Sequence, residues 1–225
     1  MTTGSGRFLV VEGPDGAGKS SLVAALAARM REAGHEPVVV REPGGTNAAE
    51  ALRRELLDKT RHFEPLEELL YITAARADLI NHVIRPGLES GRTVLSDRFE
   101  LSTFAYQVAG RGIDGGVAEI FNKAATGGLK PDLTLVLDVP ASVGMERQIA
   151  AGKRQDRLDL ESPVFQERVV AAYMAASGPG VRHLNGALDR NSVMQAAWLI
   201  IQEQWPDIFQ AGREGPRSKP RAVQQ

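Results

Sequence analysis

Residues 13–20 have the side chains and the spacing needed to bind a phosphate group. The segment Gly13-Pro-Asp-Gly-Ala-Gly-Lys-Ser20 matches the pattern G-x-x-x-x-G-K-[ST]. In such a loop the backbone N–H groups converge on a phosphate, and the glycines allow the backbone to approach it closely. The lysine reaches the outer phosphates of a nucleotide, and the final hydroxyl binds magnesium. We therefore predict a nucleotide-binding loop (P-loop) in which Lys19 and Ser20 have these two roles.

The residues on either side of this loop supply the strand and the helix that the pattern requires. The run Phe8–Glu12 (FLVVE) is apolar and rich in valine, which is typical of a strand buried on both faces. Residues 20–33 have apolar side chains at helical spacing, and Gly34 follows them. We expect the first strand to lie at the centre of a parallel sheet.

Strands and helices alternate along the rest of the chain. Further strands are predicted at residues 37–41, 92–96, 133–139 and 181–184. Helices are predicted at residues 47–58, 65–84, 102–108, 116–126, 140–149, 163–176 and 191–205, the second of them ending at Pro86 and Gly87. This alternation predicts an α/β fold in three layers, α/β/α, with helices on both faces of a mostly parallel sheet.

Composition excludes several classes of protein. The 27 Lys and Arg residues against 28 Asp and Glu give a net charge of −1, so there is no overall basic field for nucleic acid. The absence of cysteine excludes disulfides and thiolate metal sites. No run approaches the roughly 18 apolar residues of a membrane helix. We expect one cytoplasmic domain at residues 1–209, with no nucleic acid or membrane partner, and a disordered tail at residues 210–225.

Arginines beyond the predicted strands are the next candidates for an anion site. In open parallel sheets, ligands bind outside the carboxyl ends of the strands. Arg41 ends one strand, Asp97-Arg98 follow another, and Arg76 lies on the helix between them. The charged segment 150–159 is too polar to pack and is predicted to form a mobile lid.

These motifs, in this order, resemble those of the thymidylate kinases, P-loop enzymes that transfer the γ-phosphoryl group of ATP to dTMP. They are GPDGAGKS at Gly13, REPGGT at Arg41, AAR at Ala74, DRFELSTFAYQ at Asp97, GRGI at Gly110, PDLTLVLDV at Pro131 and DRLDLES at Asp156. The resemblance covers about residues 7–205. It implies a five-stranded parallel sheet, a lid at about residues 147–160 that closes over ATP, a requirement for Mg²⁺, and a homodimer.

The resemblance also implies which residues bind the phosphoryl donor. The ATP site comprises Gly13, Pro14, Asp15, Gly16, Ala17, Gly18, Lys19, Ser20 and Ser21. Ser20 and Asp97 are implied as the metal site, and Lys19, Asp97 and Arg98 as catalytic residues. The P-loop contains no arginine, so the chain resembles the mostly bacterial members whose lid supplies it. The candidates are Arg147, Arg157 and Arg154, the last in a lid one residue longer than usual.

For the acceptor, the resemblance implies a separate set of contacts. Arg41 and Arg98 bind the monophosphate, Asp15 meets the sugar 3′-hydroxyl, and Arg76 meets the O4 edge of the pyrimidine. Tyr106 stands where a ribose 2′-hydroxyl would clash, which favours deoxyribonucleotides. The implied acceptor site comprises Asp15, Arg41, Ile72, Arg76, Arg98, Phe99, Ser102, Thr103, Tyr106 and Gln107.

One departure from the family pattern leaves the acceptor open. Ile72 stands where the family usually has an aromatic residue that stacks on thymine, and such stacking contributes about 1–3 kcal/mol in nucleic-acid binders. The pocket has lost this affinity, recovered it from Tyr71 or Phe99, or been reshaped for another 5-substituent. Three functions remain: a dTMP kinase, a kinase for a modified dUMP such as 5-hydroxymethyl-dUMP or another deoxynucleoside monophosphate, and an inactive nucleotide-binding regulatory module.

Overall fold

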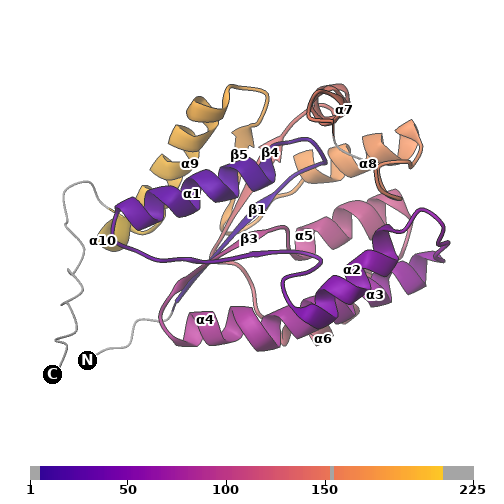
Figure 1. The fold of residues 1–225 in the computed structure, drawn as a ribbon, viewed down its shortest axis with the longest axis horizontal. Helices are drawn as coiled ribbons and strands as arrows, with labels where there is room; N and C mark the ends of the chain where they lie inside the picture. Colours follow the sequence, from indigo (N-terminus) through magenta and orange to yellow (C-terminus); the bar gives the residue numbers. More distant parts are fainter. Residues whose placement is uncertain (1–5, 153–154, 210–225) are drawn as a thin grey trace, which may run out of the picture.

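A parallel sheet of five strands forms the centre of the molecule (Figure 1). The structure is a computed structural model, and it describes residues 6–152 and 155–209. The strands lie in the order β2-β3-β1-β4-β5, so the first strand is central, as predicted. Their bounds are β1 (Arg7–Glu12), β2 (Val38–Arg41), β3 (Thr93–Asp97), β4 (Leu133–Asp138) and β5 (Val181–Asn185). The predicted tail, residues 210–225, lies outside the described residues.

Helices cover both faces of this sheet, which confirms the predicted three layers. In Figure 1, α1 and α9 lie above the strands, and α3 and α4 lie below them. Within the described part of the chain, no helix is long and apolar enough to span a membrane. The helices are α1 (Lys19–Glu32), α2 (Asn47–Leu57), α3 (Pro65–Leu79), α4 (Arg85–Glu89), α5 (Glu100–Thr103), α6 (Gly115–Thr126), α7 (Ala141–Ala150), α8 (Pro163–Met174), α9 (Arg190–Gln204) and α10 (Pro206–Phe209), with the π-helical segments η1 (Ile80–Ile84) and η2 (Phe104–Gly110).

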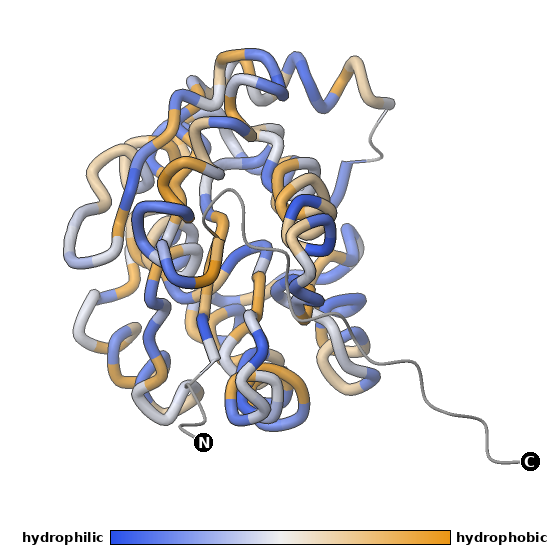
Figure 2. The backbone as a smooth tube through the Cα atoms, turned by 90° about the vertical axis from the view of Figure 1, so that its left-hand side faces the viewer, coloured by the Kyte–Doolittle hydropathy of each residue, from blue (hydrophilic) through white to orange (hydrophobic). Residues whose placement is uncertain are grey.

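The central strand β1 contributes to the hydrophobic core on both of its faces. Leu9 and Val11 pack into the cluster that α1 and α9 cover, whereas Phe8 and Val10 pack into the cluster that includes Ile80 of η1. This division follows from the alternation of side chains along a strand. Figure 2 shows hydrophobic strand segments inside the molecule, between the helices. The unbroken apolar run of β1 therefore reflects burial on both sides.

Two features of the helices differ from the sequence prediction. The helix predicted to end at Pro86 continues from α3 through η1 into α4, so that prediction was wrong. Pro86 comes just after the π-helical segment η1, where the regular i→i−4 hydrogen bonds are already interrupted, so a residue without an N–H is tolerated there. Gly87 brings α4 close to the sheet, because a Cβ there would lie 3.2 Å from Val38 and 3.1 Å from Val94. The short helix α10 was not predicted.

Two glycines bring the P-loop into close contact with α7. A Cβ built on Gly16 would lie 2.0 Å from the backbone oxygen of Gly144, and one built on Gly144 would lie 2.4 Å from that of Asp15. Gly16 also has a φ of +75°, which side chains other than glycine rarely adopt. The P-loop is thus fixed from the α7 side as well as by β1 and α1.

We predict that Gly144→Ala destabilises the protein by about 1–3 kcal/mol, because the added methyl group forces α7 and the P-loop apart. Urea unfolding measures this change. Gly115→Ala is the matched control, since a Cβ at this other helical glycine meets nothing within 4 Å. Equal stability of the two variants would contradict the close contact.

Candidate active site

A cavity of about 1010 Å³ opens between the P-loop and the residues that follow β2 and β3. The register of the sheet creates it: Val11 near the end of β1 pairs with Asp97 at the end of β3, so the two following loops lie side by side. Arg53 and Arg190 line the cavity although no sequence motif indicated them. The cationic residues on its wall are Lys19, Arg41, Arg53, Arg76, Arg98, Arg147 and Arg190. The same wall carries five carboxyl groups, so cationic side chains outnumber acidic ones by two, which favours an anionic ligand. The acidic residues are Asp15, Glu42, Asp97, Asp156 and Asp189.

Lys19 lies inside the P-loop and is only 7% exposed. Its Nζ donates a hydrogen bond to the carbonyl oxygen of Pro14, at 2.8 Å. Burial, together with the nearby charge of Arg98, lowers the pKa of Lys19 to about 8, although Asp15 and Asp97 oppose the change. The ammonium group therefore lacks a full set of charge partners until an anion enters the loop.

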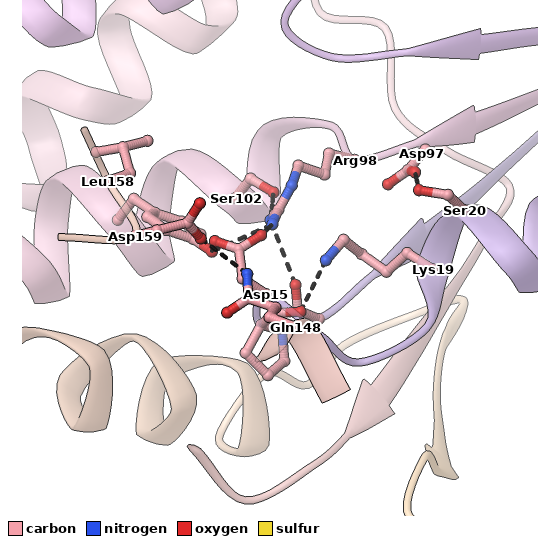
Figure 3. Close-up of polar contacts among 12 residues, drawn as sticks. Asp15, Lys19, Ser20, Asp97, Arg98, Ser102, Gln148, Leu158 and Asp159 are labelled. Carbon is pink, nitrogen blue, oxygen red and sulfur yellow. Dashed lines mark hydrogen bonds and ion pairs between the residues drawn. The ribbon is translucent and has the colours of Figure 1, made fainter. Parts of the chain in front are cut away.

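Ser20 and Asp97 meet beside Lys19 (Figure 3). The Ser20 hydroxyl donates to Asp97 Oδ2 at 2.5 Å. Ser20 lies in the first turn of α1 and Asp97 ends β3, so the contact joins the P-loop side of the site to the β3 side. Both side chains offer oxygen ligands, the type that Mg²⁺ prefers. Among the described residues, no group of three or more His, Cys, Asp or Glu side chains could bind a metal ion.

Arg98 lies at the centre of the site, between Ser102 and Asp15 (Figure 3). Its guanidinium donates to Asp15 Oδ1 at 2.7 Å and to the hydroxyl oxygens of Tyr173, Ser102 and Tyr106 at 2.8, 3.1 and 3.1 Å. The Tyr106 hydroxyl in turn donates to Asp15 Oδ2 at 2.8 Å. The structure thus brings together four residues that the sequence motifs singled out, and it adds Tyr173.

The buried carboxyl group of Glu12, at the end of β1, fixes the turn that follows β3 at Arg98. Glu12 is 0% exposed; its Oε1 accepts from the backbone N–H of Phe99 at 2.7 Å, and its Oε2 accepts from the Ser102 hydroxyl at 2.7 Å. The Tyr173 hydroxyl also donates to Oε2, at 3.2 Å. Burial raises the pKa of Glu12, although Arg98 and these hydrogen bonds oppose the change. The sequence analysis did not identify Glu12 as a site residue. The available signal was a charged residue at the end of the otherwise apolar run 8–12.

Arg76 forms a second buried cluster on the far side of β3. It is 1% exposed, and its Nε donates to Glu42 Oε2 at 2.7 Å. Its other donors reach Thr103 Oγ1 at 2.9 Å, the Phe99 carbonyl at 3.0 Å and the Asn122 side-chain oxygen. Burial raises the pKa of Glu42 to about 7, with Arg76 opposing the change. Arg76 is therefore held in one orientation at the edge of the cavity.

Comparison with known proteins identifies the family. The thymidylate kinase family model matches residues 11–189. The chain belongs to the thymidylate kinase family. It is 44% identical to the thymidylate kinase of Thermomicrobium roseum and 46% identical to that of Pseudomonas entomophila, over 93% of this chain and 99% of each relative. The thymidylate kinase of Deinococcus radiodurans is 43% identical over 75% of this chain and 82% of its own length.

The residues predicted to lie near the base divide between the cavity and the core. Ile72, Thr103 and Gln107 line the cavity. Phe99 instead packs edge-on against Phe8 in the core, with ring centroids 4.9 Å apart, and its side chain is 1% exposed. Tyr71 packs against Phe63 at 4.9 Å and does not line the cavity in the described residues. In this structure, therefore, neither the Tyr71 ring nor the Phe99 ring lines the cavity beside Ile72.

The arginines of the predicted lid lie in different places. Arg147 lines the cavity, and its Nη1 donates to the Gly186 carbonyl at 2.7 Å. Arg157 does not line the cavity; its Nη2 donates to the buried Glu68 at 2.6 Å. Arg154 lies outside the described residues. The charged segment, expected to be too polar to pack, therefore packs through Arg157, whose side chain is 11% exposed.

We predict that the affinity of the P-loop for inorganic triphosphate falls as the pH rises above about 8. The free protein loses the Lys19 charge in this range, whereas a bound anion raises the lysine pKa and keeps the charge, so binding takes up a proton. Isothermal titration calorimetry between pH 7 and 9.5 measures this affinity, which we expect to fall by up to tenfold per pH unit. In Lys19→Arg, the guanidinium stays charged throughout this range. Comparison of the two proteins at each pH therefore removes the effect of the ligand's own titration. Identical pH dependence in both proteins would contradict the lowered pKa.

Proposed function

We propose that this protein transfers the γ-phosphoryl group of ATP to dTMP, giving ADP and dTDP. Membership of the thymidylate kinase family supports this activity. The observation that carries it is the position of Lys19 in the P-loop and Arg98 beyond β3, both on the wall of one cavity. A phosphoryl transfer brings two polyanions together, so cations are needed on the donor and on the acceptor side. This cavity offers both.

On the donor side, the P-loop receives the triphosphate of ATP. Its backbone N–H groups and the N-terminus of α1 surround the β- and γ-phosphates, and Lys19 neutralises their charge. Arg147 lies near the turn at Gly186 and Ala187, to whose carbonyls it donates, on the side of the cavity proposed for the rest of the nucleotide. The proposed ATP contacts are Gly13, Pro14, Asp15, Gly16, Ala17, Gly18, Lys19, Ser20 and Ser21.

Ser20 and Asp97 are the residues that would bind Mg²⁺. Their adjacent oxygens fit an ion that takes few protein ligands and completes its shell with water and substrate phosphates. When bound, Mg²⁺ neutralises charge on the transferring phosphates. The Ser20 hydroxyl and the Asp97 carboxylate orient one another before the metal enters.

On the acceptor side, Arg98 and Arg41 bind the monophosphate. Their planar guanidinium groups suit bidentate contact with phosphate. In the structure, Asp15 pairs with Arg98 and Glu50 pairs with Arg41, at 2.7 and 2.8 Å. A dianionic phosphate provides a second partner for these cations. Asp15 is then available to accept a hydrogen bond from the sugar 3′-hydroxyl.

The base and sugar contacts set the specificity. Arg76, Thr103 and Gln107 face the polar edge of the pyrimidine, with Ile72 against its ring. The Tyr106 hydroxyl, which donates to Asp15, occupies the space that a ribose 2′-hydroxyl would need. This arrangement favours a deoxyribonucleotide, since both ends of the tyrosine are fixed: its ring packs near Phe165 and its hydroxyl is hydrogen-bonded.

The chemical step needs no general base. The attacking oxygen of the acceptor monophosphate is already anionic at pH 7, so it forms the new P–O bond directly while the γ-phosphate separates from the leaving ADP. Lys19 and Arg98 align the reacting groups and neutralise the charge that accumulates between them. A lid arginine is proposed to complete this neutralisation; the candidates are Arg147, which lines the cavity wall, and Arg154, seven positions further along the sequence.

A homodimer is the proposed assembly. Helices α3 and α6 pack against each other and expose apolar side chains. These are Leu66, Leu70, Val117 and Ile120, which are 48%, 43%, 36% and 69% exposed. Burial of such residues against a second copy is favourable.

We predict that dTMP is the preferred acceptor in an ADP-release assay that also includes dUMP, 5-hydroxymethyl-dUMP, dCMP, dGMP and the ribose form of TMP.

We also predict that Lys19→Ala lowers kcat in this assay by about 10²–10³, because one preorganised charge that stabilises the transition state is lost. Lys59→Ala, which removes an exposed lysine in the loop after α2, serves as the control.

Near-parental turnover by Lys19→Ala would contradict the proposed donor site. Preference for 5-hydroxymethyl-dUMP would reassign the acceptor to a modified dUMP and Ile72 to its recognition. ATP binding without transfer to any monophosphate would favour the regulatory module.

A further inference from the structure

The carboxylate of Glu68, in the middle of the molecule, accepts hydrogen bonds from three side chains that belong to other segments. Its Oε1 accepts from Gln107 at 2.8 Å and from Arg111 Nε at 3.1 Å. Its Oε2 accepts from Arg111 Nη2 at 2.9 Å and from Arg157 Nη2 at 2.6 Å. Glu68 is 0% exposed. A carboxylate so buried is stable as an anion only when it is fully paired.

The charges around Glu68 alternate in sign. Arg111 contacts Glu68 at 2.9 Å on one side and Glu161 at 2.7 Å on the other. Burial alone would raise the pKa of Glu68, but the hydrogen bonds and charge of Arg111, with Gln107 and Arg157, lower it. Glu68 is therefore favoured as an anion that two guanidinium groups share, and one of them, Arg111, also pairs with Glu161.

Arg157 connects this anion to the segment that leads into α8. Besides the contact with Glu68, its Nε donates to the Leu56 carbonyl at 2.8 Å and its backbone N–H donates to the Leu57 carbonyl at 3.3 Å. Its guanidinium lies 5.0 Å from the centre of the Phe63 ring. Movement of this side chain to the transferred phosphate would break its contacts with Glu68, the Leu56 carbonyl and the Phe63 ring.

The turn formed by residues 156–161 depends on that connection. Within it, Asp156 Oδ1 accepts from the backbone N–H of Leu158 and of Asp159, at 3.0 and 3.1 Å. Gln148 of α7 donates to Asp159 Oδ1 at 2.8 Å (Figure 3). Leu158 and Gln148 both line the cavity. The turn is thus a preformed part of the cavity wall, and Arg157 is its link to α2 and α3.

We propose that Glu68 is a positioning residue that fixes two parts of the acceptor cavity at once. Through Arg157 it holds the 156–161 turn against α2 and α3, and through Gln107 it orients the amide that faces the base. In this role Arg157 does not contact the transferred phosphate. The inference rests on the proposed function for the identity of the acceptor, but the contact itself is independent of it.

Two measurements on Arg157→Ala and Glu68→Gln test this role: hydrogen exchange of residues 156–162 in the unliganded protein, and steady-state kinetics with dTMP and ATP. We expect exchange in the turn to rise at least tenfold in both variants, with α1 unchanged. We expect KM for dTMP to rise about five- to twentyfold, with a smaller change in kcat. Both variants break the contact between Glu68 and Arg157. The double variant therefore has no larger effect on exchange than the more severe of the two single variants.

Two further variants sharpen the test. Arg157→Lys keeps the charge and restores part of the protection. Arg61→Ala is the matched control, because Arg61 also lies near the Phe63 ring, at 5.7 Å, and pairs with Glu55 rather than Glu68. We expect Arg61→Ala to leave both the hydrogen exchange of residues 156–162 and the KM for dTMP at parental values. If Glu68→Gln does not fold, the three arginine variants carry the test.

Either of two results would overturn the proposal. A loss of about 10³ in kcat for Arg157→Ala, with exchange and KM unchanged, would assign this arginine to the transferred phosphate. A lower melting temperature with exchange in the turn and kinetics unchanged would leave it only a stabilising role. If the parent phosphorylates no monophosphate, the proposed function fails, and the exchange experiment still decides whether Glu68 holds the turn.

Discussion

The site depends on one strained residue, Arg98, at the turn that follows β3. Arg98 has a φ of +77°, a conformation that costs a residue other than glycine about 1–3 kcal/mol. Such a backbone persists only where its surroundings fix it, and here they do: Glu12 binds the N–H of Phe99, and Asp15 binds the guanidinium. As a result, the Arg98 guanidinium points from the end of β3 toward the P-loop on the neighbouring strand β1.

This constraint organises charge before any ligand enters. Asp15 belongs to the P-loop and Arg98 to the β3 turn, so their ion pair sets the spacing of the two loops. Lys19 and Asp97 flank that pair; Lys19 is buried, whereas Asp15, Asp97 and Arg98 are partly exposed to the cavity that all four line. An electrostatic site preorganised in this way needs little rearrangement when phosphates bind. In the proposed arrangement, Glu68 orients Gln107 and Arg157 much as Glu12 orients the turn at Arg98: a buried carboxyl group fixes side chains on the cavity wall.

Sequence reasoning predicted the parts of this structure that depend on local patterns. The P-loop and the buried strand β1 follow from neighbouring residues, and the order of helices and strands follows from periodicity. Long-range contacts had no such signal: Tyr173 reaches Glu12 across 161 positions, and Arg157 reaches Glu68 across 89. Pro86 misled the prediction, because a proline that follows a π-helical segment inside a continuous helix has the same sequence signal as a proline that ends a helix. The roles of the site residues toward substrate remain predictions.

The central claim is that Arg98 is preorganised to bind the acceptor phosphate, and one comparison of affinities tests it. Calorimetry measures the binding of dTMP and of thymidine, which lacks the phosphate, to the parent and to Arg98→Lys. Lysine retains the charge that Asp15 requires but lacks the planar fork. The account predicts that the preference for dTMP over thymidine falls at least tenfold, about 1.4 kcal/mol, while thymidine affinity is unchanged. An equal loss of affinity for both ligands would contradict it.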